Sequence, residues 1–145
     1  MTSKSICFTK TLSDAVTPTK AGIYEVGFDL TAIKEVKKYG EKTTMYDTGI
    51  CVCPEEGCYT QIVARSSIVK TGYVLSNSVG IIDPTYRGSL KICLTKVDDS
   101  MPNLETPFKL AQLIVKPFIH SRMIELNTLP DSYRGDGGFG STNKD

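Results

Sequence analysis

Short apolar runs bounded by turn-forming residues dominate the middle of the chain. Four runs are rich in valine, isoleucine and leucine: QIVARSS (61–67), YVLSNSVGII (73–82), SLKICLTKV (89–97) and FKLAQLIVKPF (108–118). Proline, glycine and aspartate gather in the segments beside them: PEEG (54–57), DPTYRG (83–88) and DDSMPN (98–103). Short runs of this kind between turns are typical of strands, so the pattern predicts an all-β fold.

Two of these runs also indicate which side chains face the core. In the run 89–97, Leu90, Ile92 and Leu94 recur at every second position, which places them on one face of a strand. The segment LAQLIV (110–115) is apolar on both faces except at Gln112, as expected inside a barrel or at a subunit contact. A polar amide in such a run requires a hydrogen-bond partner.

One segment departs from the strand pattern. In TAIKEVKKYG (31–40), the apolar residues Ile33, Val36 and Tyr39 stand near helical spacing, and the segment ends in glycine. It is therefore a candidate for a short helix.

The end of the chain differs in composition from the rest. The segment RGDGGFGSTNKD (134–145) is rich in glycine, which loses more backbone freedom on ordering than any other residue. The segment LNTLPDSY (126–133) before it resembles a linker. We expect one domain over residues 1–127, followed by a linker and C-terminal arm over 128–145.

Charge and length exclude several classes of function. The chain has 17 basic and 16 acidic residues and a net charge of +1, so it lacks the basic excess typical of a protein that holds nucleic acid stably. No apolar run approaches the roughly 18 residues needed to cross a membrane. The N-terminal segment MTSKSICFTKTLSDAV lacks the long apolar region of a signal peptide, which predicts a cytoplasmic or nuclear protein.

The five cysteines do not form a recognisable framework. Five is an odd number, and no export signal accompanies it, so a set of disulfides is not expected. The segment CVCPEEGC (51–58) lacks the paired clips of a zinc site, and the only histidine, His120, is distant in sequence. Buried or half-buried thiols in strands are the better interpretation.

Five stretches, in chain order, combine polar residues with turn chemistry: VGFDLTA (26–32), ARSS (64–67), GIIDPTYRG (80–88), KLAQLI (109–114) and RGDGGFGST (134–142). The segment 77–88 is predicted as a strand, a tight turn and a return strand, with Asp83 and Tyr86 in the turn. Taken singly, each stretch has an ordinary structural interpretation, since Asp-Pro is a common start of a turn. Taken together, they resemble the five motifs of the trimeric dUTPases (deoxyuridine triphosphate nucleotidohydrolases) over about residues 5–142.

The resemblance implies a fold, an assembly and a reaction. The fold would be an all-β, distorted jelly-roll β-barrel, and three chains would form a homotrimer with a flexible, glycine-rich C-terminal arm. The reaction would be the hydrolysis of dUTP to dUMP and pyrophosphate, which limits uracil incorporation into DNA and supplies dUMP for dTTP synthesis. Mg²⁺ would be the cofactor.

The same resemblance assigns roles to individual residues. Asp83 would position and deprotonate the attacking water, Tyr86 would exclude a 2′-OH, and Asp29 would reach Mg²⁺ through a water molecule. The contacts implied for uracil and deoxyribose are Asn77, Gly80, Ile82, Asp83, Tyr86 and Phe139. Those implied for the phosphates are Arg65, Ser66, Ser67, Gln112, Arg134, Gly138, Ser141 and Thr142.

Two other interpretations share the fold. A dCTP deaminase would carry a catalytic glutamate in the strand after the third motif, where this chain has Cys93, and it would lack the glycine-rich fifth motif. A nucleotide-binding regulatory protein would keep the fold without turnover, although all the catalytic positions are present here. A Walker phosphate-binding loop does not fit, because RGDGGFGST has no Gly-Lys-Ser/Thr sequence.

Overall fold

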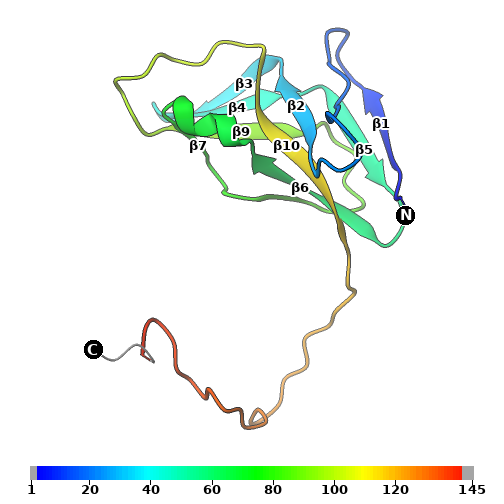
Figure 1. Cartoon of the computed structure of the whole chain (residues 1–145), viewed down its shortest axis with the longest axis vertical. Helices are drawn as coiled ribbons and strands as arrows, with labels where there is room; N and C mark the ends of the chain where they lie inside the picture. The colour runs from blue at the N-terminus through cyan, green and yellow to red at the C-terminus, as the bar shows by residue number, and fades with distance from the viewer. Residues whose placement is uncertain (1–2, 142–145) are drawn as a thin grey trace.

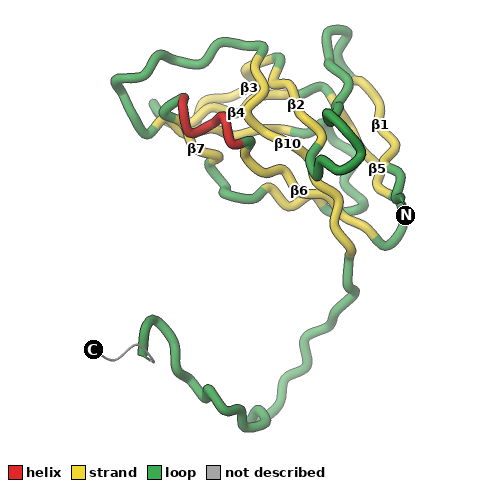
Figure 2. The backbone as a smooth tube through the Cα atoms, viewed as in Figure 1, coloured by secondary structure: helices red, strands yellow, loops and turns green. Residues whose placement is uncertain are grey.

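A computed structural model describes residues 3–141 of the chain (Figure 1). Its elements are β1 Ile6–Lys10, β2 Phe28–Ala32, β3 Lys34–Tyr39, β4 Thr43–Asp47, β5 Ile50–Pro54, β6 Cys58–Ala64, the 3-10 helix η1 Ser66–Lys70, β7 Tyr73–Leu75, β8 Gly80–Ile82, β9 Lys91–Lys96 and β10 Phe108–Pro117. In the tube view, η1 is the single helical segment among strands and loops (Figure 2). No helix in residues 3–141 has the length and apolar character needed to cross a membrane.

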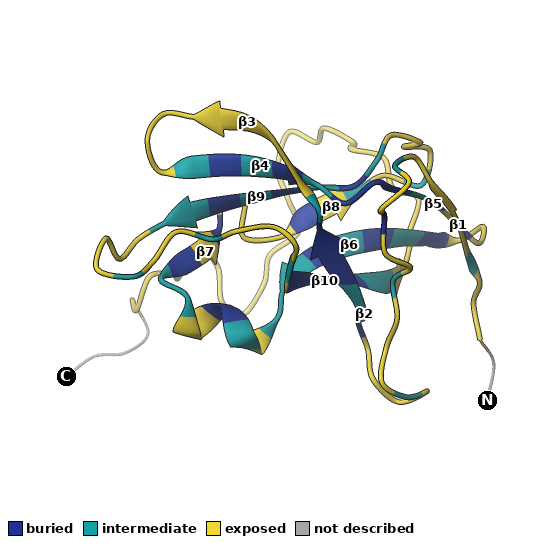
Figure 3. Ribbon diagram, turned by 90° about the horizontal axis from the view of Figure 1, so that it is seen from above, coloured by how far each residue is buried: buried dark blue, intermediate teal, exposed yellow. Residues whose placement is uncertain are grey.

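Ten antiparallel strands form three sheets around one core. The first four-stranded sheet has the order β2-β10-β6-β8, the second has the order β3-β4-β9-β7, and β1 pairs with β5 alone. Most of the buried apolar side chains of both larger sheets belong to a single hydrophobic cluster, and buried residues are dark blue in Figure 3. Strands distant in sequence lie side by side, as in a jelly roll. The predicted all-β, distorted jelly-roll fold is confirmed.

The predicted inward face of 89–97 is confirmed. Leu90, Ile92 and Leu94 are almost fully buried, with exposures of 0%, 1% and 0%. The prediction for 61–67 holds only as far as Ala64, where β6 ends and η1 begins two residues later. The rest of that run is helical because the chain must turn away from the sheet after Ala64.

The segment 31–40 contains the end of β2 and the whole of β3, so its interpretation as a short helix was wrong. β3 pairs with β4 through a register shift between Glu35 and Lys37, and all six of its residues are exposed. Val36 and Tyr39 therefore do not form the buried apolar face that a helix would need. Pairing with β4 decides the conformation, and the lysines on this exposed edge strand discourage pairing with other chains.

The segment 77–88 is not a hairpin, and the run 73–82 is two strands rather than one. β8 pairs with β6, whereas β9 pairs with β4 and β7. The turn after β8 therefore carries the chain from the first sheet to the second. A second turn, in which Ser78 adopts a φ of 61°, separates β7 from β8. The periodicity of a single strand could not reveal which sheet each half would join.

All five cysteines are free, and their exposure differs from the expectation in part. Cys58 is buried, and Cys51 and Cys93 are half-buried, as expected for strand thiols. Cys7 and Cys53 are exposed. The expectation failed for these two because both lie on the two-stranded sheet β1-β5, which has an open outer face.

The amide of Gln112 has the partner that its place in β10 requires. Its Nε2 donates a hydrogen bond to the carbonyl oxygen of Ala64 at 3.1 Å. Gly27 lies against the other side of the amide, because a Cβ atom at Gly27 would stand 2.0 Å from Gln112 Oε1. Glycine at this position therefore makes room for the polar side chain between β2 and β10.

The chain after β10 leaves the body of the protein. Phe118 still donates a backbone hydrogen bond to Gly57 at 2.8 Å, and its ring stands 6.2 Å from that of Tyr59. Beyond it, residues 119–141 contain no helix or strand and extend away from the sheets (Figure 1). We call residues 118–141 the C-terminal arm.

Gly27→Ala is predicted to displace the Gln112 side chain from its hydrogen bond with Ala64. Gln112 is half-buried, and a hydrogen bond of this kind contributes about 0.5–1.5 kcal/mol, so we expect a lower midpoint of urea unfolding at matched protein concentration. Gly22→Ala is the matched control, because its methyl group would meet only the flexible end of Glu25. Equal midpoints for the two variants would contradict the packing role of Gly27.

Candidate active site

The first, second and fourth motifs meet at one place on the first sheet. We define the Arg65 cluster as Asp29, Arg65, Ser66 and Gln112, which line a cleft of about 270 Å³. The Arg65 backbone N–H donates to the carbonyl oxygen of Leu110 at 2.9 Å, which fixes the start of η1 beside β10. The register of β2 and β10 sets Asp29 directly opposite Gln112.

The guanidinium of Arg65 is held from two sides. Its Nε lies 3.1 Å from Asp29 Oδ1, and its Nη1 donates to the carbonyl oxygen of Lys109 at 2.8 Å. About one third of each side chain in the ion pair remains exposed. A guanidinium has five N–H donors, so this oriented group keeps donors that an anion can use.

Two serines follow Arg65 at the start of η1. Ser66 is exposed and lines the cleft, as Lys20 does from the loop before β2. Ser67 Oγ is buried and has no hydrogen-bond partner among the residues that the structure describes. Hydroxyl and guanidinium donors on one side of a cleft provide a suitable surface for phosphate oxygens.

The third motif forms a second site, the Asp83 turn, which comprises residues 83–88. The Tyr86 backbone N–H donates to the Asp83 carbonyl oxygen at 3.0 Å, which closes a β-turn with Pro84 at its second position. Proline is favoured there because its ring fixes φ. Arg87 Nη1 donates to the carbonyl oxygen of Pro84 at 2.7 Å and braces the turn. Pro84 therefore suits the turn.

The Asp83 turn presents a carboxylate and a ring to solvent. Asp83 is exposed, and within residues 3–141 its side chain has no hydrogen-bond or ion-pair partner. The Tyr86 ring is 43% exposed and lies close to Gly88, where a Cβ atom would stand 2.3 Å from the tyrosine hydroxyl oxygen. The third motif thus needs glycine at position 88 to make room for Tyr86.

A lysine outside the five motifs supports this turn. Tyr86 Oη donates to the carbonyl oxygen of Ser89 at 3.1 Å, and Lys91 Nζ lies 2.5 Å from Ser89 Oγ. Lys91 is also 3.7 Å from Asp47 Oδ2, and it lines a cleft of about 190 Å³ with Asp83 and Tyr86. The sequence contained one signal for the position of Lys91. The alternation of Leu90, Ile92 and Leu94 points Lys91 away from the core.

Three other residues expected to contact the nucleoside, Asn77, Gly80 and Ile82, lie beside the Asp83 turn. Asn77 is exposed in the turn between β7 and β8, and its Nδ2 lies 3.4 Å from the place of a Cβ atom on Gly80. Ile82 is half-buried at the end of β8, directly before Asp83. The structure therefore brings these three residues together with Asp83.

Backbone register keeps the Arg65 cluster and the Asp83 turn apart. Gln112 of β10 pairs with Val63 of β6, whereas Ile82 of β8 pairs with Thr60 of the same strand. Asp83 follows Ile82, so it stands four residues along the sheet from Gln112, about 13 Å at a strand rise of about 3.3 Å per residue. The described chain does not bring the carboxylate into hydrogen-bond reach of the cluster.

The fifth motif is separate from both. In the C-terminal arm, Ser141 N–H donates to the carbonyl oxygen of Gly138 at 3.0 Å, and the Arg134 guanidinium bonds to the backbone of Gly137. Phe139 adopts a φ of 51°, and its ring is fully exposed. Thr142 lies outside the described residues.

The residues present suit a metal ion only in an indirect role. Among the residues that the structure describes, no group of three or more histidine, cysteine, aspartate or glutamate side chains gathers to hold an ion. Asp29 is the one carboxylate of the Arg65 cluster, and one of its oxygens already faces Arg65. Mg²⁺ retains much of its hydration shell, so a contact to Asp29 through water fits this donor set.

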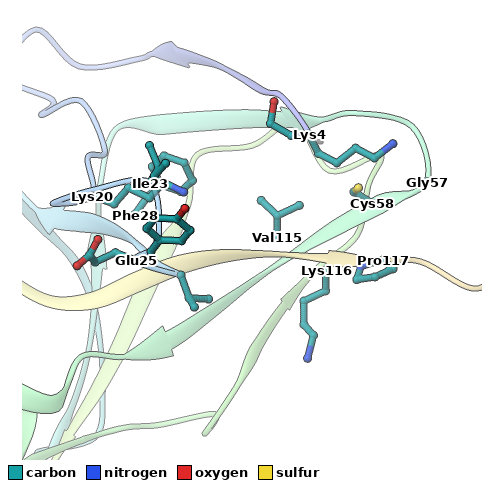
Figure 4. Close-up of a pocket in the computed structure, with 13 residues that line it drawn as sticks. Lys4, Lys20, Ile23, Glu25, Phe28, Gly57, Cys58, Val115, Lys116 and Pro117 are labelled. Carbon is teal, nitrogen blue, oxygen red and sulfur yellow. The ribbon is translucent and has the colours of Figure 1, made fainter. Parts of the chain in front are cut away.

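A larger hollow adjoins the cleft of the Arg65 cluster and shares Lys20, Glu25 and Val26 with it. It has a volume of about 740 Å³ and is lined by residues of the N-terminal segment, the loop before β2 and the end of β10, including Lys4, Ile23, Phe28 and Val115 (Figure 4). None of the residues predicted for catalysis or substrate binding lines it. Size alone therefore does not identify the reactive site.

Sequence comparisons match most of the chain to a single protein family. The dUTPase family model matches residues 13–143. The deoxyuridine 5'-triphosphate nucleotidohydrolase of Clostridioides difficile is 38% identical over 130 residues, which cover 89% of this chain and 91% of that protein. The protein of the same name from Arabidopsis thaliana is 31% identical over 134 residues, covering 92% and 80% of the two chains.

Solved structures share the fold at lower identity. A mutant dUTPase of Staphylococcus bacteriophage 80alpha with dUpNHpp has a TM-score of 0.80 at 20% identity and covers 95% of this chain and 98% of that chain. A mutant dUTPase from phage phi11 of S. aureus, described for its coordination of a structural Mg(II) ion, has a TM-score of 0.70 at 18% identity, with coverage of 86% and 97%. With the family model, the close sequence relatives and the five motifs in agreement, the chain belongs to the dUTPase family.

Proposed function

We propose that this protein hydrolyses dUTP to dUMP and pyrophosphate, with Asp83 as the general base. The observation that carries the proposal is the Asp83 turn, in which an exposed carboxylate stands beside the Tyr86 ring on a turn braced by Arg87. A general base must have a free acceptor within reach of its water, and Asp83 has one. Family membership supports the reaction and the substrate.

In this proposal the Asp83 turn binds the nucleoside. Tyr86 stands against the deoxyribose and leaves no room for a 2′-OH, because Gly88 and Ser89 fix its ring. The backbone around Gly80 and Ile82, with Asn77 beside it, hydrogen-bonds the edge of uracil. A wrong base leaves these polar groups unpaired, which is a strong source of discrimination.

The Arg65 cluster binds the phosphates. Arg65, Ser66 and Gln112 donate to phosphate oxygens, as do backbone N–H groups around Ser67. The Asp29 carboxylate holds the guanidinium in position, so little reorganisation is needed when the anion arrives. Mg²⁺ would be held by the phosphates and waters, with Asp29 acting through one water, and it would neutralise charge on the phosphate oxygens.

A complete site requires more than one chain. The separation of the Arg65 cluster from the Asp83 turn within one subunit supports a homotrimer in which a neighbour supplies the cluster. The C-terminal arm of the third subunit then covers the nucleotide. The large apolar side chains exposed on the arm support this arrangement, since monomeric proteins rarely expose so many together. These are Ile119, Met123, Ile124, Leu126, Leu129, Tyr133 and Phe139.

Residues 128–145 act as the linker and lid in this arrangement. Phe139 stacks on uracil, and Arg134, Gly138, Ser141 and Thr142 meet the β- and γ-phosphates. The local turn around Arg134 and Gly137 supports this role, because it shortens the segment that must become ordered on closure. The lid excludes water other than the nucleophile.

The competing chemistry of a deaminase is not favoured. Cys93 occupies the place of the catalytic glutamate, and its thiol lies half-buried in β9. Burial raises the pKa of the Cys93 thiol, so it stays protonated and is a poor substitute for a carboxylate.

Asp83→Asn should abolish most turnover and leave nucleotide binding intact. The amide keeps the size of the side chain but cannot accept the proton, and general base catalysis is worth about 10²–10⁴ in rate. We expect a loss of at least a hundredfold in pyrophosphate release from dUTP, with little change in affinity for dUpNHpp. Wild-type protein should prefer dUTP to UTP, dCTP and dTTP in the same assay. Turnover close to that of wild type in the variant would contradict the assigned base.

Mixing two inactive variants should restore activity if sites are shared between subunits. Asp83→Asn and Arg65→Ala chains, refolded together, form mixed trimers in which one site receives both intact residues. Random mixing should therefore recover about a quarter of wild-type dUTP hydrolysis. Light scattering should give three times the 15.9 kDa chain mass for both variants.

The control for this experiment mixes wild-type chains with chains that carry both Asp83→Asn and Arg65→Ala. After refolding, these mixed trimers have the same distribution of subunits as the mixture of the two single variants. The shared site would be contradicted if mixed trimers of the two single variants recovered no activity. A fully active monomer of the wild type would also contradict it.

Truncation after Tyr133 should remove activity without unfolding the body. The arm makes no strand pairing, so the melting temperature should stay within a few degrees of wild type. Turnover of dUTP should collapse, whereas affinity for dUMP should change little, because dUMP lacks the β- and γ-phosphates. Phe139→Ala should lower kcat/KM about five- to hundredfold, since stacking on a base is worth about 1–3 kcal/mol. Full activity of the truncated protein would show that the arm is not a lid.

A further inference from the structure

Two cysteines that the proposed reaction does not use face each other across the sheet β1-β5. The pairing register sets Cys7 of β1 directly opposite Cys53 of β5. Both side chains are exposed, whereas Val52, the neighbour of Cys53, is buried. Because successive side chains of a strand point to opposite faces, Cys7 and Cys53 share the outer face of this sheet.

The spacing of this pair suits a disulfide. The backbone N–H of Glu55 donates to the carbonyl oxygen of Ser5 at 2.9 Å, which identifies their register position as a hydrogen-bonded pair. The two kinds of antiparallel pair alternate, so Cys7 and Cys53, two positions along, also form a hydrogen-bonded pair with Cα atoms about 5.5 Å apart. Disulfides join Cα atoms about 4.4–6.8 Å apart, which this pair satisfies, and Cβ atoms about 3.5–4.5 Å apart. The Cβ atoms of a hydrogen-bonded pair stand nearer about 5.5 Å, so the two strands must draw together as the bond closes, and the resulting strain makes the bond easier to reduce.

The other three cysteines are less suitable partners. Cys51 shares the outer face of β5 but stands two residues from Cys53 on the same strand, at about 6.6 Å between Cα atoms. Cys58 is buried. Burial raises the pKa of Cys93, so little of its thiol is in the reactive thiolate form.

We propose that Cys7 and Cys53 form a reversible dithiol–disulfide site that accepts low-molecular-weight disulfides, such as oxidised glutathione, as its oxidant. The thiolate of one cysteine attacks oxidised glutathione, forms a mixed disulfide and releases one glutathione thiolate. The second cysteine thiolate then attacks the protein sulfur and releases the second glutathione. Two protein thiols are oxidised by two electrons in total, and one glutathione disulfide is reduced to two thiols.

The bond would fasten a weakly anchored edge strand. β1 pairs with β5 alone, and four of its five residues are exposed. A two-stranded ribbon is marginally stable without further packing, so β1 opens more readily than the central strands of the two larger sheets. A Cys7–Cys53 disulfide ties β1 to β5, whose alternate residues Ile50 and Val52 are core side chains.

The test uses the full chain in glutathione buffers of increasing oxidised fraction, followed by alkylation of free thiols and peptide mapping. We expect the peptide 5–10, which contains Cys7, to become linked to the peptide that contains Cys53. The link should disappear with dithiothreitol, and the oxidised protein should lose β1 to trypsin cleavage at Lys10 several-fold more slowly than the reduced protein.

Single serine variants separate this site from its alternatives. Cys51→Ser is the matched control and should keep the link and the protection, whereas Cys7→Ser and Cys53→Ser should lose both. Three outcomes would overturn the proposal: a Cys51–Cys53 bond, glutathione adducts without a link, or a bond between chains on a non-reducing gel. Equal cleavage of the oxidised and reduced wild type would overturn the fastening of β1. None of these readouts depends on dUTP hydrolysis, so the outcome is independent of the proposed function.

Discussion

The register of the sheet β2-β10-β6-β8 is the constraint on which the candidate site depends. It sets Asp29 opposite Gln112 and holds the backbone of Arg65 against β10, so that an acid, a guanidinium and an amide meet at one end of the sheet. The same register sends Asp83 to a different part of the sheet. A shift of one residue would turn every one of these side chains to the opposite face. The described chain therefore keeps the Arg65 cluster and the Asp83 turn apart, and the proposed function needs a second subunit to join them.

The ion pair between Asp29 and Arg65 serves orientation more than stability. Both side chains are about one third exposed, and pairs of this kind contribute roughly 0–1 kcal/mol. Their value lies in fixing a guanidinium before any anion binds, because a preorganised donor loses less entropy when it makes its hydrogen bond. Two glycines serve similar ends. Gly27 makes room for Gln112, and Gly88 makes room for Tyr86.

The sequence predicted the strands and their buried faces well, because alternation is a local property. Leu90, Ile92 and Leu94 carry that signal because they stand at every second position of the run. It failed for 31–40, where pairing with β4 overrides the helical spacing of Val36 and Tyr39. It also failed for 77–88, because no local pattern states that β8 and β9 join different sheets.

The residues of the candidate site were proposed on a different basis. The residues of each motif carry their own geometry: proline begins the turn after Asp83, and glycine stands where a side chain would collide with Tyr86. What the motifs could not show is support from outside them. Lys91 bonds to Ser89, to which the Tyr86 hydroxyl also donates, and Asp47 pairs with Lys91. Neither Lys91 nor Asp47 belongs to a motif. Such partners depend on the pairing of β4 with β9, which only the assembled fold reveals.

Energetics explain why a lid in this position should consist of glycine-rich chain. Ordering about eight residues costs on the order of 8–16 kcal/mol, so closure must be driven by strong contacts that exist only with the triphosphate. Hydrogen bonds to charged groups contribute about 1.5–3 kcal/mol each, and a triphosphate offers several such acceptors at once. The arm already forms local turns at Arg134 and Gly138, and Phe139 already has a left-handed φ, which reduces the ordering that remains. In the proposed reaction, dUMP no longer presents those acceptors once pyrophosphate is cleaved off, so the free energy then favours the open arm. The same entropy that opposes closure therefore favours the release of product.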